Sequence, residues 1–88
     1  MIKEFIREHT HYIDWEVFWK RRFVSEEFIE EFKDYAIWPI ISRHQKLSAK
    51  YIWAHEDVLD LKLISANYKI SMPTRDKAFY RYCELNHK

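Results

Sequence analysis

Residues 24–52 read VSEEFIEEFKDYAIWPIISRHQKLSAKYI, and the closing LSAKYI repeats the pattern of the opening VSEEFI. With a period of 23 residues, three segments come into register, starting at Phe5, Phe28 and Tyr51. Each continues with an isoleucine and closes with an aliphatic residue followed by serine. Such a period is typical of stacked helical units, because one short unit cannot bury its apolar face alone.

Each unit is predicted to form two short helices. In the middle unit, Ser25 is a good N-cap and the two glutamates after it suit the positive end of a helix dipole. We expect a first helix over about 26–36. Pro39 favours a new start, so a second helix is expected over about 39–46. In the other units the corresponding caps are aspartates: Asp14 and Asp60.

The expected fold class is all-α, a compact stack of three two-helix repeats in one domain spanning residues 1–88. The repeats cover about residues 2–24, 25–47 and 48–70. The segment after Ser71 departs from the pattern. We expect it to form a capping helix over about 74–86, giving about seven helices in all.

The composition excludes several classes of function. The chain has no glycine, which phosphate-cradling loops, dinucleotide fingerprints and nucleophile elbows require. Fifteen Lys and Arg against fourteen Asp and Glu give a net charge of +1, so there is no global attraction to nucleic acid.

The same counts bear on location. Cys83 is the only cysteine, so no internal disulfide can form and a reducing compartment is expected. The longest apolar run, residues 36–41, is far shorter than the roughly 20 residues that cross a bilayer. The charged N-terminal segment is unlike a signal peptide. We therefore expect a cytoplasmic protein without a membrane partner.

Residues 25–48 resemble a unit of the form LSEEFI..F.D...W..IS..Q, which recurs in tandem in uncharacterised proteins of bacteriophages and large DNA viruses. The resemblance weakens on either side and fades after Ser71. It implies an all-helical repeat fold and a viral origin, which would place the protein in an infected host cell. The family supplies no catalytic motif.

The strongest local charge lies in FWKRRF, residues 18–23, and basic residues recur one unit later. Units stacked in parallel would gather these helix ends into a basic ridge, suited to phosphates or to an acidic protein surface. Cations near helix C-termini also complement the dipole without any ligand, and that alternative stays open. Two tryptophans lie outside the shared apolar positions and are expected to be exposed. The predicted binding residues are Trp19, Lys20, Arg21, Arg22, Arg43, His44, Lys46 and Trp53.

No cofactor, metal or catalytic residue is expected. His9 and His55 share a repeat position with Phe32, which favours a packing role. Cys83 and His87 do not match a structural zinc pattern. The glutamates of the middle unit are expected on a solvated helix face rather than in a pocket.

Our first hypothesis is therefore a non-enzymatic binding protein that docks on and inhibits a host protein. A CRISPR-type defence effector is one candidate, suggested by small size and the viral resemblance. The alternative is a small nucleic-acid-binding protein that uses the same ridge. Self-association is a third hypothesis, because stacked units with apolar ends can continue into another chain.

Overall fold

The computed structural model describes residues 3–86 and confirms the all-α fold, with no strand in that range. Two single turns of 3-10 helix follow the first and third helices, at Thr10–Tyr12 and Lys33–Tyr35. The α-helices are α1 (Lys3–Glu8), α2 (Trp15–Arg21), α3 (Glu26–Glu31), α4 (Trp38–His44), α5 (Ala49–Ala54), α6 (Leu61–Ser65) and α7 (Met72–Asn86).

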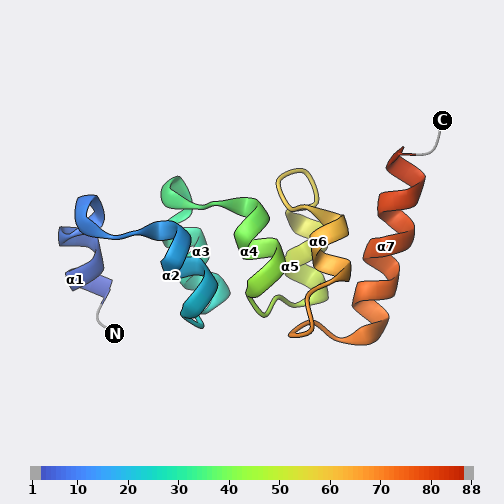
Figure 1. Cartoon of the computed structure of the whole chain (residues 1–88), viewed down its shortest axis with the longest axis horizontal. Helices are drawn as coiled ribbons and strands as arrows, with labels where there is room; N and C mark the ends of the chain where they lie inside the picture. Colours follow the sequence, from blue (N-terminus) through green and yellow to red (C-terminus); the bar gives the residue numbers. More distant parts are fainter. Residues whose placement is uncertain (1–2, 87–88) are drawn as a thin grey trace.

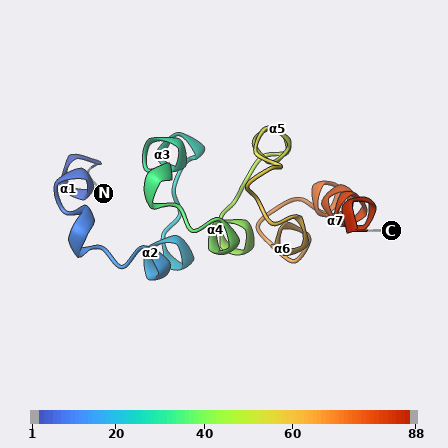
Figure 2. The same ribbon diagram turned by 90° about the horizontal axis from the view of Figure 1, so that it is seen from above.

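The helices begin at regular intervals along the chain. The starts of α1, α3, α5 and α7 are 3, 26, 49 and 72, and those of α2, α4 and α6 are 15, 38 and 61. Both series advance by the period of 23 residues seen in the sequence. Figure 1 shows the helices following one another along the molecule, which measures 45 × 24 × 20 Å. Seen from above, α1, α3 and α5 form one row and α2, α4 and α6 the other (Figure 2). The last helix, α7, packs against α6 at the far end.

The predicted caps Ser25, Asp14 and Asp60 are confirmed, and Ser48 caps α5 in the same way. In each of them a side-chain oxygen accepts a hydrogen bond from the backbone N–H three residues later, which satisfies a donor that the helix itself leaves unpaired. The four pairs are Ser25 with Phe28, Ser48 with Tyr51, Asp14 with Val17 and Asp60 with Leu63. These caps fix where four of the helices start.

The predicted helix over 26–36 is too long. It ends at Glu31, because Phe32 leaves the helical conformation and the chain tightens into a 3-10 turn. The N–H of Ala36 then bonds the carbonyl of Lys33, three residues back. Ala36 and Ile37 are extended, which lets the chain turn into α4 at once. The other bounds differ less, since α4 spans Trp38–His44 and α7 begins at Met72.

The core changes in character along the stack. Between α2 and α3 it is aromatic, with Phe18 stacked on Phe28 and Phe28 on Phe32, at centroid distances of 5.6 and 4.5 Å. Toward α7 it is aliphatic, built from Leu61 and Ile64 of α6 and from Ala78 of α7. The isoleucine shared by the three units is buried in each: Ile6, Ile29 and Ile52.

Candidate binding surface

The C-terminal ends of α2, α4 and α6 lie along one edge of the molecule. The three helices run in the same direction and end on the lower side in Figure 1, and α4 packs against both α2 and α6. Basic side chains at these ends and in the connections after them form what we call the basic ridge. Its members are Lys20, Arg21, Arg22, Arg43, His44, Lys46 and Lys69. Six of these are predicted binding residues, so the parallel stacking on which that prediction depended is present.

The charges of the ridge act on one another. The pKa of His44 lies below its ordinary value because of partial burial and because of the positive charges of Arg43, Lys69 and Lys20. Lys69 donates a hydrogen bond from Nζ to the backbone carbonyl of His44 at 2.7 Å. The helix ends of successive units are therefore close enough to form one field of positive charge.

Within residues 3–86, most cations of the ridge have no carboxylate partner. Lys20 pairs with Glu16 at 3.6 Å on the same helix. Among residues 3–86, no ion pair joins a carboxylate to Arg21, Arg22, Arg43 or Lys46. The N–H donors of these arginines are therefore available to bind a carboxylate or phosphate through two parallel hydrogen bonds.

Two buried side-chain amides cap the C-terminal ends of α2 and α4. The Gln45 side chain donates from Nε2 to the carbonyls of Trp19 and Arg22, at 2.8 and 2.6 Å, and its Oε1 accepts from the N–H of Val24. Asn67 donates from Nδ2 to the carbonyls of Ser42 and Gln45, at 2.8 and 2.7 Å. These four carbonyls are bonded by amides, and of the ridge cations Lys69 bonds one further carbonyl, that of His44. Hydrogen bonding to helix ends therefore accounts for only part of the ridge.

Two exposed aromatic rings flank the ridge, and neither was among the predicted binding residues. Phe23 is 70% exposed, and Nζ of Lys69 lies 4.1 Å from its centroid. Tyr68 is 83% exposed, and the guanidinium carbon of Arg75 lies 5.3 Å from its centroid. Their sequence signal was available, since both stand next to ridge cations and outside the shared apolar positions.

The prediction that Trp19 belongs to this surface is wrong. Its side chain is 0% exposed and packs between α2 and α3, edge-on to Phe28 and stacked on Trp15. The indole N–H donates to the carbonyl of Tyr35 at 3.0 Å, which satisfies its one polar group. Trp19 is therefore a core residue.

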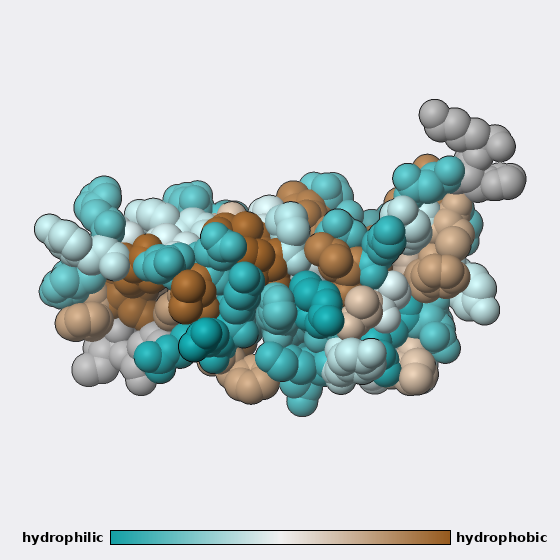
Figure 3. Space-filling model, in the orientation of Figure 1, coloured by the Kyte–Doolittle hydropathy of each residue, from teal (hydrophilic) through white to brown (hydrophobic). Residues whose placement is uncertain are grey.

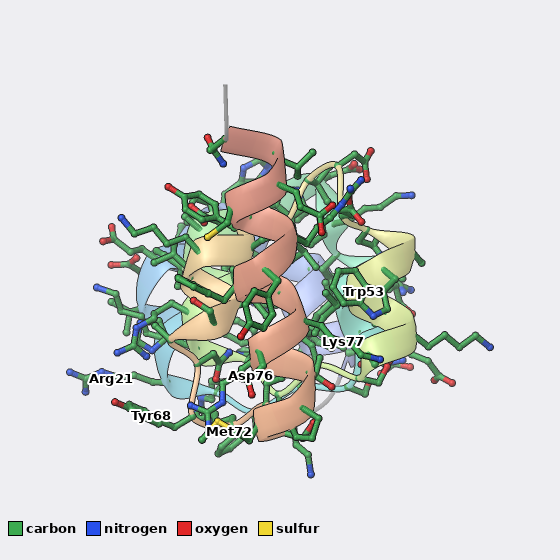
Figure 4. The ribbon with its side chains drawn as sticks, turned by 90° about the vertical axis from the view of Figure 1, so that its right-hand side faces the viewer. Arg21, Trp53, Tyr68, Met72, Asp76 and Lys77 are labelled. Carbon is green, nitrogen blue, oxygen red and sulfur yellow. The ribbon has the colours of Figure 1, made fainter. Side chains whose placement is uncertain are left out.

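Trp53 does not join the ridge either. It lies on α5 and is half-buried against the core. Viewed along the stack, Trp53 and Lys77 project on one side of the molecule, whereas Arg21 and Tyr68 lie on the other (Figure 4). The eight predicted binding residues thus divide into six on the ridge, one in the core and one on the opposite side.

His9 and His55 make packing contacts of one kind. The Nδ1 of His55 donates to the carbonyl of Tyr51 at 2.9 Å, and the ring stacks on Tyr51. His9 makes the same pair of contacts with Phe5, at 2.7 Å. The Nε2 of His55 also contacts the carboxylate of Glu30 on α3. In the described part of the chain, no three His, Cys, Asp or Glu residues form a group that could hold a metal ion.

No protein-family model, curated protein or solved structure matches this chain. The resemblance to viral repeat proteins therefore stays a prediction. Between residues 3 and 86, no helix has both the length and the apolar character needed to cross a membrane.

Proposed function

We propose that this chain is a non-enzymatic binding protein that docks through the basic ridge on an acidic surface of a partner protein and blocks that surface sterically. The observation that carries the proposal is the gathering of Arg21, Arg22, Arg43 and Lys46 on one edge without carboxylate partners among the described residues. Arginine is enriched at interface hot spots, and its fork matches a carboxylate.

The partner class is a separate step in the proposal. The resemblance of residues 25–48 to viral repeat units makes a host protein the partner to test first, including a CRISPR-type defence effector. A ridge with Phe23 and Tyr68 at its margins combines aromatic rings with arginines, and both kinds of side chain are enriched at protein interfaces.

The test is capture of partners from lysate of a candidate host, with and without nuclease treatment, followed by affinity measurement on the purified partner. The ridge variant is Arg21→Glu combined with Lys46→Glu, two exposed ridge positions. Its control is Lys50→Glu combined with Lys77→Glu, which changes the net charge equally at exposed positions off the ridge. We expect the ridge variant to lose the partner and the control to keep it, with unchanged circular dichroism in both. Equal binding by the two variants would exclude the ridge as the docking surface.

A second candidate function, binding of single-stranded nucleic acid, is favoured by Phe23 and Tyr68, because exposed rings beside cations can stack on bases. This candidate predicts that affinity for a labelled oligonucleotide falls steeply with salt, since each neutralised phosphate releases counterions. It also predicts weaker binding by Phe23→Ala and Tyr68→Ala. A flat salt dependence would exclude it.

A further inference from the structure

The end of the stack formed by α1 and α2 contains an open hollow of about 200 Å³, lined by Phe5, Ile6, Ile13, Phe18 and Arg22. Phe5 is 60% exposed at its mouth. Figure 3 shows hydrophobic side chains gathered over this end of the molecule. The opposite end is covered by α7, so the two ends of the stack differ.

The equivalent residues of the next unit, 23 positions later, are covered by side chains of α2. The residues that follow the lining residues by 23 are Phe28, Ile29, Ala36, Ile41 and Gln45. Four of these five are buried. They are covered from the side of α2, whose Trp19 packs on Phe28 at a centroid distance of 6.1 Å and is itself fully buried. The molecule thus contains an occupied example of the hollow that stands open at its end.

The occupied example has two polar contacts in addition to its apolar wall. The indole N–H of Trp19 donates to the carbonyl of Tyr35, and Gln45 donates to the carbonyls that end α2. One period earlier stand the carbonyl of Tyr12 and the side chain of Arg22. The guanidinium of Arg22 has several N–H donors that can bond the last carbonyls of a helix. The open hollow therefore has the same three features as the internal example: an apolar wall, a carbonyl acceptor and a side-chain donor.

We propose that this open end, the N-terminal socket, is a docking site for the C-terminal part of an α-helix of a partner protein that carries a tryptophan. The aromatic side chain would enter among Phe5, Ile13 and Phe18, with its N–H directed at the carbonyl of Tyr12. Arg22 would cap the last carbonyls of the docked helix. Within residues 3–86 no helix fills that place. The proposal is independent of ridge docking and shares only Arg22 with it.

The probe is a peptide of residues 14–24, the segment that occupies the internal example. Glu16 and Lys20 lie 3.6 Å apart at i and i+4, so a lactam between their side chains can hold the peptide helical. Circular dichroism establishes the helicity of the peptide before use. The control peptide carries Trp19→Ala and has the same charge.

Binding is measured by titrating labelled full-length protein with the peptide and recording backbone NMR shifts and affinity. We expect shifts at Phe5, Ile6, Ile13 and Phe18, and at least about tenfold weaker binding of the control peptide, as for loss of an interface hot spot. In the protein, Phe5→Glu should abolish binding, and the exposure of this side chain makes the change compatible with folding.

Substitution of Arg22 separates this proposal from ridge docking. Arg22→Gln should keep peptide binding within about threefold, because Gln45 performs the same task in the internal example, whereas Arg22→Glu should lose it. Arg43→Glu, on the ridge only, should have no effect. A helical peptide that does not bind, that binds Phe5→Glu equally well, or that shifts ridge residues instead would overturn the socket and leave the proposed function standing.

Discussion

Asn67 makes at the α4–α6 interface the contact that Gln45 makes at the α2–α4 interface. Each is 1% exposed, and each donates from its side-chain amide to two backbone carbonyls. Gln45 bonds carbonyls at the end of α2, and Asn67 bonds carbonyls at the end of α4. The carbonyls bonded by Asn67 belong to residues 42 and 45, which follow those bonded by Gln45, 19 and 22, by one period. Neighbouring units are therefore joined by directed hydrogen bonds as well as by apolar packing.

Gln45→Ala should lower the free energy of unfolding by about 2–4 kcal/mol, because it removes three hydrogen bonds and leaves buried carbonyls unpaired. The measurement is urea unfolding followed by circular dichroism. The neighbouring exposed residue gives the control, since Lys46→Ala should change stability by less than about 0.5 kcal/mol. Equal stability of the two variants would contradict the role of the amide.

Trp19→Ala should cost about 3–5 kcal/mol of stability, because it opens a cavity in the aromatic core between α2 and α3. The matched variant is Trp53→Ala, which removes the same side chain from a half-buried position and should cost less. Chemical unfolding of both variants tests the ranking. If the Trp19→Ala protein is no less stable than the Trp53→Ala protein, Trp19 is not a core residue.

Tyr51→Phe should leave stability unchanged or raise it by about 1 kcal/mol. The Tyr51 hydroxyl is buried and has no hydrogen-bond partner among the described residues. Burial, with the charges of Glu30 and Glu26, raises its pKa. Removing an unpaired buried polar group relieves a desolvation cost. The equivalent positions of the first two units already carry Phe5 and Phe28. A loss of more than about 1 kcal/mol in urea unfolding would show that the hydroxyl has a partner in solution.

His44 should titrate below the ordinary histidine value of about 6.5, and neutralising a neighbour with Arg43→Gln should raise its pKa. Its folded-state pKa is lowered, so the unfolded chain takes up the proton first as the pH falls. The contribution of His44 to stability is therefore present above about pH 6.5 and is lost as the pH falls toward the folded-state pKa.

NMR titration of the His44 ring gives the pKa directly, and urea midpoints across this range give the linkage. The His44→Gln variant should lose less stability than the unsubstituted protein over the same pH range. Both proteins contain the other four histidines, so the difference between them reports on His44 alone. An Arg43→Gln protein with an unshifted His44 pKa would show that the charges of the ridge do not interact.

The repeat in the sequence predicted where helices begin, because a helix start depends on the capping side chain next to it. Ser25 and Asp60 cap the helices that they were expected to cap, and the helix starts recur every 23 residues. The end of α3 was not predicted, because apolar residues from Phe28 to Tyr35 continue at helical spacing while the backbone tightens into a 3-10 turn after Glu31.

The side chains that meet between units were harder to predict, because a repeat does not say which neighbour a position faces. Trp19 lies outside the apolar positions shared by the units and was expected to be exposed, yet it is fully buried against Phe28 of the adjacent unit. Gln45 aligns with the exposed Arg22 but has a preceding helix to cap. The ridge itself was predictable, since parallel stacking alone brings the basic helix ends together.

The constant interval between helix starts also constrains how the length of this chain can vary. Adding or removing 23 residues at the boundary between Leu47 and Ser48 would bring each helix into contact with a neighbour of the same type and keep every cap in place. An insertion of another length would add no complete pair of helices and would lengthen the connection between α4 and α5. Length variants that gain or lose helices should therefore differ in whole steps of this interval, with α7 kept as the covering helix and the number of basic helix ends changing in proportion.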